Sequence, residues 1–261
     1  MSRGPADALT VGSWLRRSAR LWGRAQRLLV FPLVAAALEL VATLPAALAA
    51  GEAGDFTTYA GYAVTLDERL VDALGGTVEI SAGEWAGLAA WLVASQIVFA
   101  WATTAFARSL MEGRVVRRPP VAVLARVAAL YLGASVISLP IFVLAGSDAG
   151  VLPALALWSV FTAALLVADY AIAIDGVGLR QAVASNLATL RRTPLVALAG
   201  FWLVFATALL VDALFDRTIA DADDVFPPFL AAAALAHGLR AYLVDCALIV
   251  LYLGDRETSV S

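Results

Sequence analysis

The sequence contains no lysine, one cysteine and one histidine. The single cysteine, Cys246, excludes an intramolecular disulfide and a cysteine-based metal site, and the single histidine, His237, excludes a multi-histidine metal centre. The motifs His-Glu-x-x-His, Gly-x-Ser-x-Gly and Gly-x-x-x-x-Gly-Lys are also absent. We therefore expect no metal, no cofactor and no catalytic residues, and we predict that the protein is not an enzyme.

Charge is scarce and apolar residues are abundant. Of the 261 residues, 15% are charged and 62% are hydrophobic, and the mean hydropathy is +0.85. The apolar residues form six runs, each close to the ~20 residues that cross a ~30 Å hydrocarbon core. We predict an all-α polytopic membrane protein, a six-helix transmembrane bundle that occupies residues 28–253, with spans at 28–50, 85–107, 121–145, 151–174, 195–215 and 229–253. The first run follows basic residues, as in a signal peptide, but its apolar part is too long for one, so we expect a retained helix.

Residues 1–27 form a basic segment with the period of an amphipathic helix. At 100° per residue, five arginines fall within an arc of about 100° and face away from Val11, Trp14, Leu21 and Trp22. We predict that these arginines bind anionic lipid headgroups of the cytoplasmic leaflet; they are Arg16, Arg17, Arg20, Arg24 and Arg27. A membrane-protein partner is the alternative, and we do not expect nucleic acid as a ligand.

Two further segments outside the spans have helical patterns. In the acidic loop 51–84, Thr65-x-x-Glu68 predicts a capping box and a short helix on the outer surface. Ser81-x-x-Glu84 predicts a second capping box at the start of the next span. After Asp175-Gly176, four apolar residues within an arc of about 80° predict a helix that lies on the interface; they are Leu179, Val183, Leu187 and Leu190.

The arginines predict an orientation. Fourteen of the eighteen lie in segments that share one side of the membrane, whereas Arg69 and Arg217 are the two in the loops of the other side. Those other loops contain twelve acidic residues. By the positive-inside rule, we predict a cell-membrane protein with both termini cytoplasmic, including the tail 254–261.

Among the charged or titratable residues inside the predicted spans, six are the candidate site residues: Glu39, Arg126, Asp169, His237, Arg240 and Asp245. An unpaired charge costs roughly 3 kcal/mol at mid-membrane on insertion scales, so we expect partners. Matching depths predict a central Glu39–Arg240 pair and an inner Arg126–Asp169–Asp245 cluster. The cluster is interpreted either as structural ion pairs, as a cavity open to the cytoplasm that binds an anionic or zwitterionic ligand, or as a proton relay. No metal site is predicted here.

The segment from Asp169 to Pro194 carries a family resemblance. A span ends in Tyr170-Ala-Ile-Ala-Ile, Asp175-Gly176 follows, and a helix with Ala182-x-x-Ser185 and Arg191-Arg192 leads into the next span. This arrangement, with the six-span layout, resembles prokaryotic multi-pass proteins that are similar to the membrane domain of some glycerophosphoryl diester phosphodiesterases. The resemblance implies an accessory or lipid-associated membrane domain, and it implies no reaction because the catalytic domain of those enzymes has no counterpart in these residues.

The sequence thus favours a lipid-associated accessory or scaffold protein of the membrane. The alternative is a transporter or permease of a small or lipid-like solute, with Glu39, Arg240 and Asp245 along the path. A lipid-modifying enzyme would need a nucleophile or a metal site that the sequence does not supply.

Overall fold

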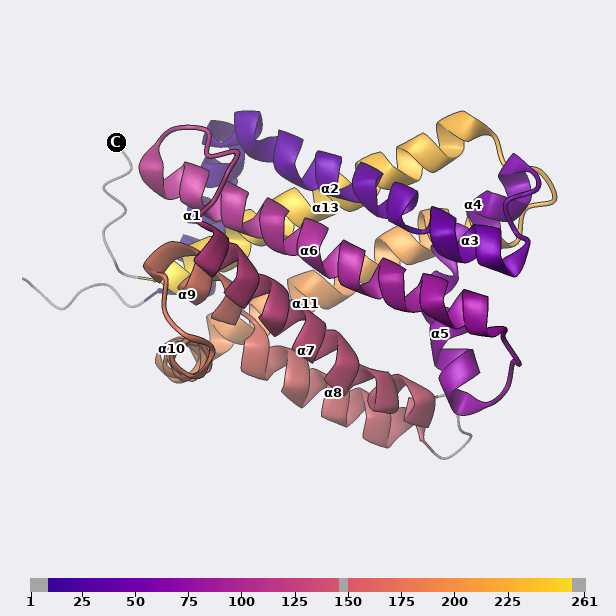
Figure 1. Ribbon diagram of the computed structural model, residues 1–261. Helices are drawn as coiled ribbons and strands as arrows, with labels where there is room; N and C mark the ends of the chain where they lie inside the picture. The colour runs from indigo at the N-terminus through magenta and orange to yellow at the C-terminus, as the bar shows by residue number, and fades with distance from the viewer. Residues whose placement is uncertain (1–8, 146–149, 255–261) are drawn as a thin grey trace, which may run out of the picture.

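The structure, a computed structural model, describes residues 9–145 and 150–254, and within these residues all regular structure is helical. Six helical stretches are long and apolar enough to cross a membrane, as the sequence predicts (Figure 1): Gln26–Ala50, Ala82–Glu112, Val121–Ala145, Val151–Asp175, Pro194–Ala220 and Pro227–Leu253. Residues 1–8 of the basic segment, most of the turn at 146–150 and the tail beyond Gly254 lie outside the described residues.

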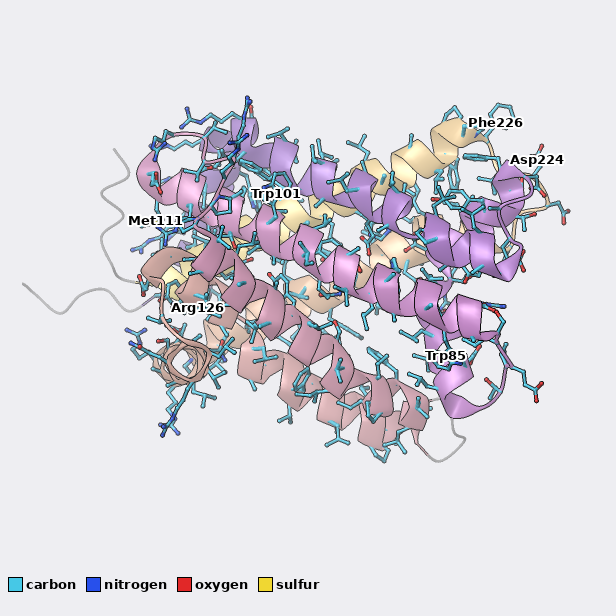
Figure 2. All side chains as sticks on the ribbon, viewed as in Figure 1. Trp85, Trp101, Met111, Arg126, Asp224 and Phe226 are labelled. Carbon is cyan, nitrogen blue, oxygen red and sulfur yellow. The ribbon has the colours of Figure 1, made fainter. Side chains whose placement is uncertain are left out.

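Charge is separated along the bundle. One end, here called the basic end, carries α1 (Val11–Arg24), α10 (Leu179–Arg192) and the loop 113–120 with Arg114, Arg117 and Arg118 (Figure 1). The opposite end, the acidic end, carries α4 (Phe56–Val64), α5 (Leu66–Gly75) and the loop 221–226 with three aspartates. Figure 2 shows Arg126 near the first end and Asp224 at the other.

The N-terminal helix α1 packs on the protein. Its cap is a capping box between Thr10 and Ser13. The indole nitrogen of Trp14, a residue only 2% exposed, donates to the carbonyl of Ala247 at 2.8 Å, and that of Trp22 donates to Leu243 at 3.0 Å. Both acceptors belong to α13 (Pro227–Leu253). The tryptophans of the apolar face are therefore covered by α13, and the four arginines of α1 are exposed.

The first span is a composite of η1 (Gln26–Leu29), α2 (Val30–Ala42) and α3 (Leu44–Ala50). The break at Thr43 precedes Pro45, whose ring cannot continue the hydrogen-bond ladder. The Thr43 hydroxyl donates to the carbonyl of Leu40 at 2.7 Å, and the Tyr59 hydroxyl donates to the same carbonyl. Side chains thus satisfy an acceptor at the break, and Tyr59 connects α4 to this span.

The two predicted capping boxes have different outcomes. Thr65 precedes α5, but its hydroxyl donates to the carbonyl of Gly61 at 2.9 Å and does not cap α5. Thr65 also directly follows the last residue of α4, so its side chain bonds back to that helix. Ser81 does cap α6 (Ala82–Glu112), accepting from the amide of Glu84 at 3.1 Å. The Glu84 side chain then pairs with Arg69, whose Nε lies 2.5 Å from Oε1. This ion pair fixes α5 against the first turn of α6.

The fourth span is interrupted. It comprises α8 (Val151–Leu165) and α9 (Ala168–Asp175), and it packs beside α7 (Val121–Ala145). Asn186 of α10, fully buried, fills the break: its Oδ1 accepts from Val167 N at 2.9 Å, and its Nδ2 donates to the carbonyls of Ala163 and Ala164. The helix α10 is therefore held to the span by a side chain, whereas Leu179 and Leu187 of the predicted apolar arc are exposed.

The fifth span continues further than predicted. After α11 (Pro194–Val211) the chain makes one π-helical turn, η2 (Asp212–Asp216), and then α12 (Arg217–Ala220). A π turn inserts an extra residue per turn and rotates the side chains that follow it. Asp216, predicted to begin an acidic loop, is therefore part of the helical span and faces α13.

Candidate functional site

A cavity of about 730 Å³ lies between α2, α5, α6, α7, η2 and α13, next to the acidic end. Its wall includes hydroxyl and amide groups from Ser95, Gln96, Ser135 and Ser138, and the aromatic rings of Trp91 and Phe142. The titratable groups of the wall are one imidazole and five carboxyl groups, from His237, Glu39, Asp67, Glu68, Asp72 and Asp216. This volume falls within the range of small-molecule sites, and the wall is strongly acidic.

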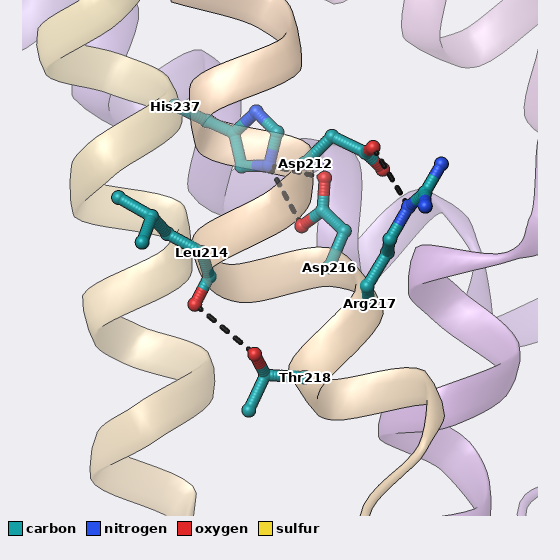
Figure 3. Close-up of polar contacts among 6 residues, drawn as sticks. All are labelled: Asp212, Leu214, Asp216, Arg217, Thr218 and His237. Atoms are coloured by element: carbon teal, nitrogen blue, oxygen red, sulfur yellow. Dashed lines mark hydrogen bonds and ion pairs between the residues drawn. The ribbon is translucent and has the colours of Figure 1, made fainter.

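The π turn η2 places an aspartate against the histidine of α13 (Figure 3). His237 Nε2 lies 3.0 Å from Oδ1 and 3.1 Å from Oδ2 of Asp216. On the same turn, Asp212 Oδ2 lies 3.2 Å from the Nε atom of Arg217. Arg217 thus pairs with Asp212, and the imidazole is the group in contact with the Asp216 carboxylate.

Acidic groups crowd the part of the cavity formed by α5. Asp67 is exposed, but desolvation by the surrounding helices raises the pKa of its carboxyl, and the nearby charges of Asp216 and Asp212 raise this pKa further. Desolvation also raises the pKa of Glu68, with a contribution from Asp67. Carboxylates that raise each other's pKa in this way lie in a region of negative potential, which attracts positively charged ligands.

The predicted Glu39–Arg240 pair is wrong. The ion pairs within the described residues do not include it. Glu39 lines the cavity with His237, whereas Arg240 is not part of that wall, and its Nη2 points to the carbonyl of Val204 on α11 at 3.5 Å. The reason is helix rotation: α13 meets α2 at Gly238, and a residue two positions further lies about 200° around the helix.

The predicted Arg126–Asp169–Asp245 cluster is also not formed. Asp169 accepts from the Tyr131 hydroxyl at 2.7 Å, and Asp245 accepts from the Tyr170 hydroxyl at 2.6 Å. Arg126 is exposed and donates to the carbonyl of Gly176 at 2.6 Å. Sequence reasoning missed both tyrosines, although a tyrosine inside an apolar span is itself a signal, since a buried hydroxyl needs a polar partner.

The cavity therefore differs from the one expected from the sequence. We expected a polar cavity open to the cytoplasm that could bind an anion or a zwitterion. The cavity lies next to the acidic end, which is opposite to the end predicted to face the cytoplasm, and no arginine belongs to its described wall. The carboxyl groups of this wall would repel an anionic ligand, so the geometry does not favour the anion among the two expected ligands.

The arginines of the basic end remain largely unpaired. The described residues offer no hydrogen bond or ion pair to the side chains of Arg16, Arg20 and Arg24, and all three are exposed. Arg17 donates to the carbonyl of Gly254 at 3.0 Å, and Arg27 donates to that of Gly113 at 2.8 Å. The first three arginines are thus free to contact an external anion, whereas Arg17 and Arg27 bind the C-terminal ends of α13 and α6 at the basic end.

Comparisons with known proteins give no relative: no family model matches the chain, and neither the curated proteins nor the solved structures include a match. The described residues also contain no group of three or more histidine, cysteine, aspartate or glutamate side chains that could hold a metal ion. Any function must therefore be argued from the cavity and from the charged ends of this chain.

Proposed function

We propose that this multi-pass membrane protein is a carrier that binds a small organic cation in the acid-lined cavity. The observation that carries the proposal is the wall of the cavity, whose described residues include five carboxyl groups, one imidazole and no arginine. The rings of Trp91 and Phe142 support an organic cation, because aromatic faces attract ammonium groups.

A second set of buried acids supports transport over simple binding. Asp245 follows His237 on α13 in the direction of the basic end, and Asp169 lies on the neighbouring α9. Ionisable groups inside spans commonly mark the pathway of an ion or a solute. A cation that leaves the cavity toward the basic end would next meet these carboxyl groups, so the chain offers acidic groups at two depths.

The orientation follows from the arginines. We propose that the basic end faces the cytoplasm, since the positive-inside rule places arginine-rich segments there. The cavity would then open to the outside of the cell membrane, and both termini would be cytoplasmic. In this arrangement the negative potential of the acidic end concentrates cations at the mouth of the cavity before they bind.

The proposal is tested by binding of ethidium, a fluorescent organic cation, to the purified protein in detergent. Fluorescence anisotropy should show saturable binding that tetraethylammonium displaces and benzenesulfonate does not. Glu39→Gln and Asp216→Asn should each weaken binding at least about tenfold, because each removes a negative charge that would lie within a few ångströms of the ligand.

Matched controls are available at the acidic end. Glu79 and Asp223 are exposed and do not line the cavity, so Glu79→Gln and Asp223→Asn should leave ethidium binding unchanged. If Glu39→Gln and Glu79→Gln weaken ethidium binding equally, the binding reflects general surface charge and contradicts the proposal. The absence of saturable binding would also contradict it.

The accessory role is the second candidate, and the free arginines of α1 support it. We propose that Arg16, Arg20 and Arg24 hold anionic lipid headgroups, as the resemblance to lipid-associated membrane domains also suggests. Native mass spectrometry of protein from phosphatidylglycerol-rich nanodiscs tests this role. Replacing the three arginines by glutamine should lower the number of retained phosphatidylglycerol molecules, whereas Arg118→Gln should have a smaller effect.

A further inference from the structure

The cavity contains one basic side chain among its described residues, and that side chain is His237. Its side chain is 40% exposed, so it is open to the cavity, whereas that of its partner Asp216 is 18% exposed. Imidazole is the side chain whose charge ordinarily changes between pH 5 and pH 8. The histidine can therefore add a positive charge to the acidic wall or withdraw it.

The geometry indicates which nitrogen exchanges a proton. Nε2 lies within hydrogen-bond distance of both oxygens of Asp216, so it keeps its hydrogen and donates to that carboxylate in both charge states (Figure 3). The proton that distinguishes imidazolium from imidazole is then on Nδ1, for which the described residues offer no hydrogen-bond partner. Loss of this proton leaves the bond to Asp216 intact.

The charged groups around His237 come from several elements. Glu39 of α2, Asp67 of α5 and Asp216 of η2 share the cavity wall with it, and each carries or can carry a negative charge. Two arginines lie nearby but outside the described wall. Arg217 pairs with Asp212 and interacts with the charge of Glu68. Arg240, one turn along α13, points to the carbonyl of Val204 and interacts with the charge of Asp216. Within the described wall, His237 is thus the residue that can place a positive charge next to these carboxyl groups.

We propose that His237 exchanges a proton for the organic cation, so that binding of one cation releases one proton and the carrier works as a cation/proton exchanger. This inference rests on the proposed function. The physical reason is competition for the same carboxylates: two positive charges a few ångströms apart repel each other, and loss of the Nδ1 proton removes one of them. One positive charge enters the cavity as one leaves, so the net charge of the site is conserved.

The experiment measures the protons released when ethidium binds to the purified full-length protein. Calorimetric titration at pH 6 in two buffers of different ionisation enthalpy gives that number, and the wild type should release protons, up to one per bound ethidium. The affinity should also fall as the pH is lowered, approaching about tenfold per pH unit once the histidine is protonated in the free protein. His237→Gln keeps an N–H donor for Asp216, and it should bind ethidium without proton release and with little dependence on pH.

A second measurement keeps the inference testable if His237→Gln does not fold. The chain has one histidine, so protein labelled with ¹⁵N-histidine and purified without a histidine tag gives a single imidazole spin system. Saturating ethidium should move the titration midpoint of this signal to lower pH in the wild type. The Glu79→Gln variant should behave as the wild type does in both measurements.

The outcomes separate the two proposals. Absence of ethidium binding overturns the proposed function and this inference with it. Ethidium binding without proton release, or with a histidine midpoint that does not move, overturns the exchange alone. Proton release that persists in His237→Gln also overturns it, because the proton would then come from a carboxyl group such as that of Glu39.

Discussion

The side-chain amide of Asn186 replaces the missing backbone contacts where the fourth span is broken: its Oδ1 lies 2.9 Å from the backbone nitrogen of Val167. No proline or glycine lies between Ala163 and Val167, so the break has no local cause in the sequence. It exists because a residue nineteen positions away, on α10, supplies both a donor and an acceptor. A buried helix interruption needs such a substitute partner, because unpaired backbone groups are costly in an apolar environment.

Asn186→Ala should therefore destabilise the protein strongly. The substitution leaves the amide of Val167 and the carbonyls of Ala163 and Ala164 without this partner, and buried unsatisfied groups cost about 1–3 kcal/mol each. We expect a total loss of about 3 kcal/mol, measured as a lower thermal midpoint in detergent. Gln181→Ala, at an exposed position on the same helix, should have little effect. Equal midpoints for the two variants would contradict the role assigned to Asn186.

The close approach of α2 and α13 gives a second prediction. A Cβ atom added at Gly238 would lie 2.6 Å from Leu33 Cδ2 and 2.9 Å from Leu33 Cα, so the two helices would have to separate. We expect Gly238→Ala to cost about 2 kcal/mol of stability, as overpacking does. It should also weaken ethidium binding, because α2 carries Glu39 and α13 carries His237.

Gly133→Ala is the matched control, because a Cβ atom there would have no neighbour within 4 Å. This variant should be neutral or slightly more stable, since alanine reduces the freedom of the unfolded chain. A Gly238→Ala protein with unchanged stability and unchanged binding would show that the helices are further apart than described.

A pH-dependent prediction concerns Asp67. Its pKa is raised in the folded protein, mainly by desolvation, so the ionised carboxylate is less favourable in the folded than in the unfolded chain. Ionised Asp67 therefore destabilises the folded protein fully at a pH above its pKa in the folded state, and not at all at a pH below its pKa in the unfolded chain. Lowering the pH from neutrality removes this destabilisation. Asp67→Asn should raise the thermal midpoint at pH 7 by no more than about 1 °C, because solvent screens the charge of this exposed residue, and the gain should shrink at pH 4. Asp223→Asn should show no such trend.

Much of the architecture could be predicted because it depends on composition and periodicity along one chain. The six spans follow from apolar runs of membrane length, and the separation of basic and acidic ends follows from the placement of arginine and acid in alternate loops. The helices α5 and α10 follow from helical periodicity for the same reason, whereas α4 was not predicted.

The site could be predicted only in part, because contacts between helices depend on how each helix is rotated. Glu39 and Arg240 lie at similar depths, which suggested a pair, but Arg240 points to α11 and His237 contacts Asp216. That contact depends on the π turn at Asp212–Asp216, for which the sequence gives no signal. Depth can be read from a sequence, whereas the choice of partner requires the packed structure.

Protection of a cysteine in the cavity tests the central claim most directly. Ser138 lines the cavity, and the native Cys246 is buried, so a Ser138→Cys variant carries one accessible thiol within the described residues. We predict that a membrane-impermeant maleimide labels this thiol and that ethidium slows the labelling severalfold. Adding Glu39→Gln to the Ser138→Cys protein should remove this protection. A cation site in this cavity would be contradicted if ethidium did not slow the labelling, or if it slowed the labelling equally in the Glu39→Gln background.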